Sequence, residues 1–174
     1  MTADLLQRFE RAVTTWNPLL ARKLQPGLPE MEIQRLLRRR KVEGNLGPVL
    51  TLYGWRNGAN LDAELVGSKR GFFPAAKPYY LLDLEMAVGH LDHARIVGRR
   101  RPELQAGSMY LPLFWDGSTG WIAVDLGPAH HGRVILSEHR SETPFRNLRA
   151  CLEDFLNDAI RAIETSVELR LDEQ

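Results

Sequence analysis

Two short strands joined by a tight turn are predicted by the stretch Tyr110-Leu-Pro-Leu-Phe-Trp-Asp-Gly-Ser-Thr-Gly-Trp-Ile-Ala-Val-Asp-Leu126. Its middle, residues 116–120, supplies side chains that tolerate the left-handed backbone angles of a turn. After the turn the residues alternate between two strand faces: Ile122, Val124 and Leu126 share one, and Trp121, Ala123 and Asp125 share the other. A third strand is predicted at 133–137. The stretch therefore indicates architecture, and it places no reactive group for catalysis.

Amphipathic helices are predicted on both sides of these strands. Leu5, Phe9, Val13 and Trp16 follow one another at steps of four, four and three, which places them on one face of a helix over residues 4–16. Similar patterns predict helices at residues 30–42, 46–56, from 84 onward behind a cap at Asp83, and 147–167, with an irregular segment at 59–80. Helices first, strands in the middle and a helix last are typical of a single α+β domain.

The charge and cysteine content of the 174 residues narrow the class of protein. Lys and Arg number 23 and Asp and Glu 22, a net charge of +1, so the chain lacks the basic excess of most nucleic-acid binders. Its single cysteine, Cys151, cannot form an internal disulfide, which suits a reducing compartment. The amino terminus lacks a signal-peptide pattern, and no stretch approaches the ~20 apolar residues of a membrane span. We therefore expect a cytoplasmic protein without a membrane partner.

Short motifs follow one another in a recognisable order along residues 29–156. They are a helix opened by Pro29 with Ile33, Leu36 and Leu37; Leu52-Tyr-Gly-Trp-Arg-Asn-Gly58; Phe73-Pro74; Tyr80-Leu-Leu-Asp-Leu-Glu85; the hairpin Leu111-Pro-Leu-Phe-Trp-Asp-Gly117 with 121–126; Gly132-Arg133-Val134; and the closing helix. In this order they resemble the SUKH superfamily, which includes the yeast cell-wall assembly regulators and many bacterial toxin-immunity proteins. Two features depart from that pattern: the usual Leu-Pro appears as Leu46-Gly47-Pro48, and the early helices are rich in arginine.

The resemblance implies a single α+β domain with a strongly bent central antiparallel sheet and helices packed around it. Residues 1–28 would form an amino-terminal helix and linker, 29–156 the SUKH-like core, and 157–174 the end of the closing helix and a tail. The activity that the resemblance implies is binding, because immunity members block a cognate toxin and the yeast regulators act as interaction hubs. It implies no catalytic residue and no obligatory cofactor.

Several residues carry reactive or metal-binding side chains, and each has a simpler structural interpretation. His90-Leu-Asp-His93 places two potential zinc ligands on one helix face, but no third ligand follows at a readable spacing. His130-His131 lies in an apparent turn. Cys151 is expected on the apolar face of the closing helix, as a core residue. Ser118 lacks the strand–turn–helix context of a hydrolase nucleophile. We therefore expect no enzyme activity, no metal and no cofactor.

Two basic runs, Arg38-Arg-Arg-Lys41 and Arg99-Arg-Arg101, leave two kinds of partner open. If adjacent in space, they would neutralise several phosphates of a nucleic acid. Aromatic residues do not interleave with either run, so stacking on bases has no support. An acidic protein partner explains the same arginines, because complementary charge steers encounter. Both runs also suit the carboxyl ends of helices, where cations interact favourably with the dipole.

The residues predicted to contact a partner are Trp115, Asp116, Trp121, Asp125, Arg38 and Arg39. Tryptophan and arginine are enriched at binding hot spots. Trp121 shares its strand face with Asp125, which predicts a wetter face, and a large aromatic on a wet face indicates a contact surface. Trp55, near a helix end, is expected in the core instead.

The resulting hypothesis is a non-enzymatic protein-binding domain that occludes a partner, as toxin-immunity proteins do. A net charge of +1 argues against immunity to a basic nuclease, because such immunity proteins tend to be acidic. A regulatory scaffold related to the cell-wall assembly proteins is the alternative. Further rivals are a nucleic-acid binder that uses the arginine runs and a metal-dependent hydrolase that uses His90 and His93.

Overall fold

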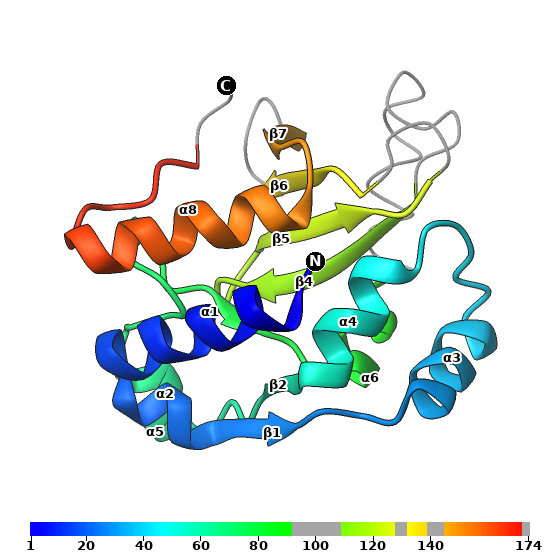
Figure 1. Cartoon of the computed structure of the whole chain (residues 1–174), viewed down its shortest axis with the longest axis horizontal. Helices are drawn as coiled ribbons and strands as arrows, with labels where there is room; N and C mark the ends of the chain where they lie inside the picture. Colours follow the sequence, from blue (N-terminus) through cyan, green and yellow to red (C-terminus); the bar gives the residue numbers. More distant parts are fainter. Residues whose placement is uncertain (92–108, 128–131, 139–144, 172–174) are drawn as a thin grey trace.

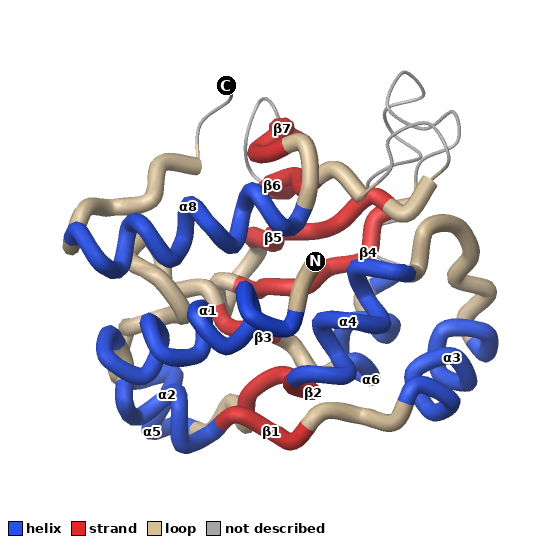
Figure 2. The backbone as a smooth tube through the Cα atoms, viewed as in Figure 1, coloured by secondary structure: helices blue, strands red, loops and turns tan. Residues whose placement is uncertain are grey.

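An antiparallel sheet forms the centre of the protein (Figures 1 and 2). The computed structural model describes residues 1–91, 109–127, 132–138 and 145–171. Within them the five strands of this sheet follow chain order: β3 (Tyr80–Leu81), β4 (Tyr110–Trp115), β5 (Gly120–Asp125), β6 (Val134–Glu138) and β7 (Phe145–Arg149). A second sheet pairs β1 (Leu24–Pro26) with β2 (Arg56–Ala59). The predicted hairpin and third strand are confirmed as β4, β5 and β6.

The β4–β5 hairpin has one irregularity, and proline explains its position. Trp115 lies opposite Trp121, but the register shifts between Pro112 and Phe114, so Leu113 is an extra residue on β4. Proline lacks the N–H that a ladder hydrogen bond needs, and a bulge is one of the few places where a sheet accepts it. The turn places Gly117 at a φ of 79°, as the glycine-rich sequence of the turn predicts.

Helices pack around the sheet in two groups (Figure 1). The helices are α1 (Ala3–Trp16), α2 (Pro18–Lys23), α3 (Glu30–Arg39), α4 (Gly47–Trp55), α5 (Ala63–Gly67), α6 (Leu84–Gly89) and α8 (Leu152–Thr165). Side-chain caps explain where several of them begin, because an oxygen of the preceding residue accepts an otherwise unsatisfied backbone N–H: Thr2, Asn17, Asp62 and Asp83 cap α1, α2, α5 and α6. α1 packs against α8, and α3 packs mainly against α4 and α6.

A single large apolar core joins these elements. The predicted inward residues of the first helix, Leu5, Phe9 and Val13, are buried in it. The predicted apolar face of β5, Ile122, Val124 and Leu126, lies in the same cluster. Aromatic rings fill its centre: the ring centroids of Phe73 and Phe155 are 5.5 Å apart, and those of Phe72 and Phe114 are 5.7 Å apart. The predicted α+β domain with a central antiparallel sheet is confirmed.

Several predicted boundaries are wrong, each for a local reason. The closing helix begins at Leu152, not at 147, because residues 145–149 pair with β6 as the strand β7. The second predicted helix ends at Arg39, and Lys41 turns the chain with a φ of 52°. The segment 59–80 contains the short helix α5, and its last residue begins β3. The helix predicted at 46–56 is confirmed as α4, and Asp83 caps α6 as predicted.

Candidate functional site

The turn of the β4–β5 hairpin is built around Asp116. One carboxylate oxygen, Oδ1, accepts hydrogen bonds from the backbone N–H of Ser118 (2.8 Å), the hydroxyl of Ser118 (3.1 Å) and the backbone N–H of Gly120 (2.9 Å). The other, Oδ2, lies 3.4 Å from Nζ of Lys77. The indole N–H of Trp115 donates to the carbonyl oxygen of Ser118 (3.0 Å). Asp116 is 7% exposed, so this carboxylate organises the turn.

The second face of β5 is buried, so the prediction of a wetter face there is wrong. Trp121 is 6% exposed and Asp125 is fully buried. Asp125 Oδ1 accepts hydrogen bonds from the backbone N–H of Met109 and of Gly127, both at 2.9 Å, and Oδ2 lies 3.7 Å from Nη2 of Arg133. Two backbone amides thus satisfy Oδ1, and the Arg133 guanidinium lies beside the buried Oδ2 without a hydrogen bond to it, although the alternation alone predicts that this carboxylate faces water.

Other residues of this face explain why it is dry. Tyr110, Ala123 and Ile135 form a second, smaller apolar cluster on neighbouring strands. The ring of Trp121 lies 5.7 Å from the ring of His90, which follows α6. Of the four hairpin residues predicted to contact a partner, only Trp115 is half-buried and the other three are buried. Their part in partner binding stays a prediction.

The other two predicted contact residues belong to an exposed group of cations at the end of α3. Arg38, Arg39, Arg40 and Lys41 are all exposed, and we call them the α3 basic cluster. Arg38 Nη2 donates to Oε1 of Gln34 (3.3 Å). Within the described part of the chain, Arg39 and Lys41 take part in no ion pair. α3, which ends in this cluster, lies at the edge of the molecule beyond α4 (Figure 1), and the exposed cations can steer the encounter with a partner.

A cleft lies beside the basic cluster, between α3 and α6. Its volume is about 510 Å³, and it is lined by Leu36, Arg39, Arg40, Glu85 and Val88. Leu36 and Val88 are buried, whereas the two arginines and Glu85 are exposed. The cleft therefore has an apolar floor and a charged rim. We call it the α3–α6 cleft.

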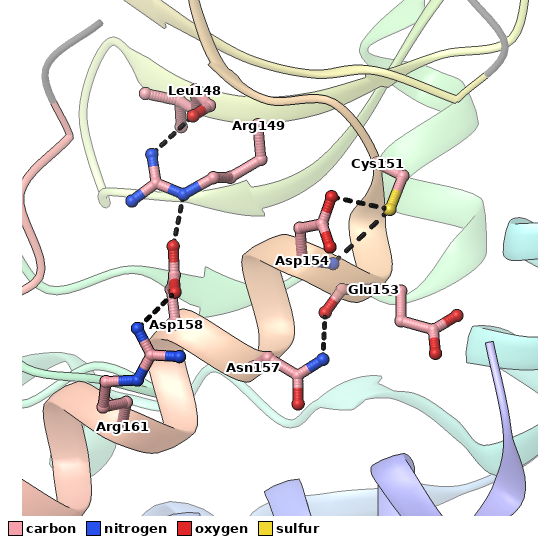
Figure 3. Close-up of polar contacts among 8 residues, drawn as sticks. All are labelled: Leu148, Arg149, Cys151, Glu153, Asp154, Asn157, Asp158 and Arg161. Carbon is pink, nitrogen blue, oxygen red and sulfur yellow. Dashed lines mark hydrogen bonds and ion pairs between the residues drawn. The ribbon is translucent and has the colours of Figure 1, made fainter. Parts of the chain in front are cut away.

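A larger groove, of about 740 Å³, is lined mainly by residues of α8 and the end of β7. Figure 3 shows several of these residues and the polar contacts among them. Its charged lining residues are Arg8, Arg133, Arg149, Asp154, Asp158, Arg161 and Glu164. Arg149 donates from Nε to a carboxylate oxygen of Asp158 and from Nη1 to the carbonyl oxygen of Leu148. Arg161 Nη1 lies 3.4 Å from the other oxygen of Asp158. Arg149 and Arg161 thus share one carboxylate, and the network fastens the edge strand β7 to α8.

Cys151 caps α8, and the prediction of a core cysteine is wrong. Its sulfur accepts from the backbone N–H of Asp154 (3.5 Å), and the thiol lies 3.2 Å from Oδ2 of the same residue, as Figure 3 shows. The side chain is half-buried. Burial raises the pKa of the Cys151 thiol, and because the thiolate is the nucleophile, this environment opposes nucleophilic catalysis.

The remaining candidates are divided between described and undescribed residues. His90 is half-buried against Trp121, whereas His93, His130, His131 and the run 99–101 lie outside the described residues. Among the residues that the structure does describe, no group of three or more His, Cys, Asp and Glu side chains is arranged to hold a metal ion. The described helices include none with the length and apolar character to cross a membrane.

The structure separates the predicted contact residues into two places. Trp115 and Trp121 lie opposite each other in the hairpin, with Asp116 in the turn between them. Arg38 and Arg39 lie on α3, which packs mainly against α4 and α6. Trp55, predicted in the core, is half-buried against it, and its indole N–H donates to Glu10 (2.8 Å). The sequence analysis predicted neither the α3–α6 cleft nor the larger groove. The cleft joins two helices that are far apart in the chain, and the groove lies along a strand, β7, that was predicted as part of the closing helix.

Comparison with known proteins assigns this chain to no family. No protein-family model matches this chain, and no curated protein matches it. The class that the structure defines is therefore an α+β domain, and the resemblance to the SUKH superfamily stays a prediction.

Proposed function

We propose that this chain is a non-enzymatic protein-binding domain that acts in the cytoplasm and docks an acidic partner protein on the α3 basic cluster. The observation that carries the proposal is the exposure of the four positively charged side chains at 38–41. Four consecutive cations are exposed, and within the described residues Arg39 and Lys41 form no ion pair. A partner can therefore engage Arg39 and Lys41 without first breaking an ion pair within the described part of the protein.

The larger groove along α8 is a weaker candidate for the partner site, because two of its arginines are already paired. There, Asp158 is shared between Arg149 and Arg161, and the pairs hold β7 against α8. A ligand that recruited these arginines would have to replace partners that they already have, and removing one member of a partly buried pair is costly. The charge of the α3 basic cluster, by comparison, steers encounter and adds arginine contacts of the kind found at hot spots.

The particular role that we propose is toxin immunity, in which the domain occludes its partner through a preformed surface. An antiparallel sheet with helices around it is the architecture that the resemblance to the SUKH superfamily implies, and this agreement supports a binding role. A regulatory scaffold related to the cell-wall assembly proteins is the alternative. Gene neighbourhood separates the two, because an adjacent secreted toxin favours immunity and an envelope-biogenesis operon favours regulation.

Co-purification with the proteins encoded beside its gene tests the proposal. We expect one neighbour, a toxin domain, to form a stable complex, and the double variant Arg38→Glu/Arg39→Glu to weaken it by about tenfold or more. The matched control is Arg11→Glu/Arg22→Glu, which reverses two exposed arginines on α1 and α2 with the same change of net charge. The control should change the affinity by about twofold at most.

Two results of the binding experiments with neighbouring proteins would overturn the proposal. One is the failure of every neighbouring protein to bind. The other is equal weakening by both double variants, which would mean that net charge and not this surface governs the interaction. A duplex DNA fragment titrated at two salt concentrations serves as the nucleic-acid arm. Tight binding to it that weakens steeply with salt would assign the basic cluster to a nucleic acid instead.

A further inference from the structure

The α3–α6 cleft combines arginines of the basic cluster with apolar residues and a carboxylate. Its floor is the apolar surface of Leu36 and Val88, both buried, which come from two different helices. Arg39 and Arg40 line it from α3, and Glu85 lines it from α6. The rim is therefore cationic on one side and anionic on the other. Its volume, about 510 Å³, falls within the range of roughly 300–1,000 Å³ typical of ligand pockets.

The carboxyl end of α6 leaves space for a ligand. Gly89 ends this helix, is exposed, and lies one turn from Glu85, on the same side of α6. A Cβ atom added at Gly89 would meet no atom within 4 Å. Nothing among the described residues fills the space beside Gly89.

We infer that the α3–α6 cleft binds an acidic segment of the partner polypeptide that carries one apolar anchor residue. The anchor packs on Leu36 and Val88, and carboxylates on one side of it pair with Arg39 and Arg40. Glu85 repels acid on the other side, so the segment binds in one orientation. This inference rests on the proposed function, and it adds the partner's chemistry and the site where its anchor is buried.

The mixed rim decides between this occupant and a nucleic acid. A phosphate backbone would gain from Arg39 and Arg40, but it would gain nothing from the apolar floor and would be repelled by Glu85. An acidic segment with an apolar anchor uses both features. Arginine beside a small apolar depression is also the arrangement in which binding hot spots are found.

A synthetic peptide tests the inference directly. The probe is an acidic peptide of about 15 residues with a central leucine flanked on one side by glutamates. We expect saturable binding with a Kd below about 1 mM, and a loss of about tenfold when the leucine is replaced by alanine or the glutamates by lysine. Amide chemical-shift changes on binding should centre on Leu36, Arg39 and Val88.

Variants of the cleft sharpen the test. Gly89→Leu fills the open space beside α6 and should weaken peptide binding about tenfold. Gly54→Leu is the matched control, because Gly54 is also an exposed helical glycine with no atom within 4 Å of an added Cβ. It should change binding by about twofold at most. Glu85→Gln removes the repulsive charge and should strengthen binding of the acidic peptide about two- to fivefold.

The outcomes separate this inference from the proposed function. If a neighbouring protein binds and Arg38→Glu/Arg39→Glu weakens it while Gly89→Leu does not, the proposed function stands and the inference fails. If no neighbouring protein binds, the proposed function fails, and the peptide titration still decides whether the cleft has the inferred chemistry. No saturable peptide binding, equal binding of the lysine peptide, or equal effects of Gly89→Leu and Gly54→Leu would overturn the inference. Self-association abolished by Gly89→Leu would assign the cleft to a second copy of this chain and would also overturn it.

Discussion

Asp116 and Asp125 are buried carboxylates near opposite ends of β5, and backbone amides donate to one oxygen of each, while a cationic side chain lies near the other oxygen. Asp116 accepts from the amides of the turn, and Asp125 accepts from those of Met109 and Gly127, which flank the strand pair. Buried carboxylates are tolerated where such donors compensate for lost hydration. Alternation along β5 placed Trp121 and Asp125 on the correct shared face but predicted the wrong environment for it. The amides that donate to Asp125 belong to residues outside β5, so the alternation of residues within the strand could not reveal them.

Replacing Asp116 by alanine should lower the free energy of unfolding by about 1–3 kcal/mol, because the N–H of Gly120 would be left buried without its acceptor. Urea denaturation measures this change. Thr119→Ala in the same turn is the control, and it should alter the unfolding free energy by about 0.5 kcal/mol at most. Equal stability of the two variants would show that the carboxylate does not organise the turn.

The ion pair between Lys23 and Asp62 predicts a pH dependence of stability. The hydrogen bond from Lys23 holds the pKa of Asp62 below its ordinary value, and the amide of Leu65 acts in the same direction. The hydrogen bond to Asp62 holds the pKa of Lys23 above its ordinary value of 10.5. The contribution of Asp62 is therefore complete above about pH 3.9 and is lost as the pH falls through its pKa in the folded protein. That of Lys23 is complete below 10.5 and is lost as the pH rises through its raised pKa.

The variant Asp62→Asn tests this dependence, because asparagine still caps α5 but cannot pair with Lys23 as an anion. Wild type should be the more stable protein at neutral pH, and the gap should close in acid as Asp62 is protonated. Urea denaturation at a series of pH values measures the gap. A gap that is unchanged from neutral to strongly acidic pH would contradict the assignment. Solvent screens this half-exposed pair, so only the direction of the change is predicted.

At the scale of elements, close backbone contacts join the small β1–β2 sheet to its neighbours. Gly58 in β2 has a φ of +76°, and a Cβ added there would lie 2.3 Å from the backbone nitrogen of Asp83. A Cβ on Gly27, which follows β1, would lie 1.9 Å from the carbonyl oxygen of Gly54 in α4. Only glycine fits both positions, so these contacts determine how β1, β2 and the start of α6 pack.

Gly58→Ala should destabilise the protein by more than about 2 kcal/mol, because it adds a clash with backbone at a φ that alanine rarely adopts. Gly54→Ala is the matched control, since it lies in α4 with open space around the added methyl group. Alanine there should stabilise the helix by up to about 1 kcal/mol. Thermal unfolding measures both variants, and a Gly58→Ala protein as stable as wild type would contradict the packing described for β2.

Helices were more predictable than short strands, for a physical reason. The apolar stripes of α1 and α3 repeat over several turns, so the sequence of each of these helices contains its own signal. β1, β2 and β3 are two to four residues long, and each exists because of a partner distant in the chain. The sequence analysis missed β7, because Leu148 fits the apolar spacing of α8 extended toward the amino terminus. Leu148 belongs instead to a strand that pairs with β6. The boundary lies at Cys151, whose sulfur caps the helix.

For the whole molecule, a net charge of +1 conceals an uneven distribution. Opposite charges are paired along α8, where Asp158 forms ion pairs with Arg149 and Arg161. The side chains of the α3 basic cluster, in contrast, are exposed. Arg38 and Arg39 were predicted to contact a partner, and both are exposed because Ile33, Leu36 and Leu37 occupy the buried positions of that helix. The sequence did not predict the α3–α6 cleft, since Glu85 and Val88 are separated from α3 by more than forty residues of sequence.

The most direct test of a binding role for this surface is the ionic-strength dependence of association with the partner found by co-purification. Stopped-flow mixing of the two proteins at several salt concentrations gives the association rate constant. We predict a wild-type rate constant that falls as salt is added, and a rate constant for Arg38→Glu/Arg39→Glu that is about tenfold or more lower at low salt and nearly independent of salt. Identical rate constants and identical salt dependence for the two proteins would contradict the account.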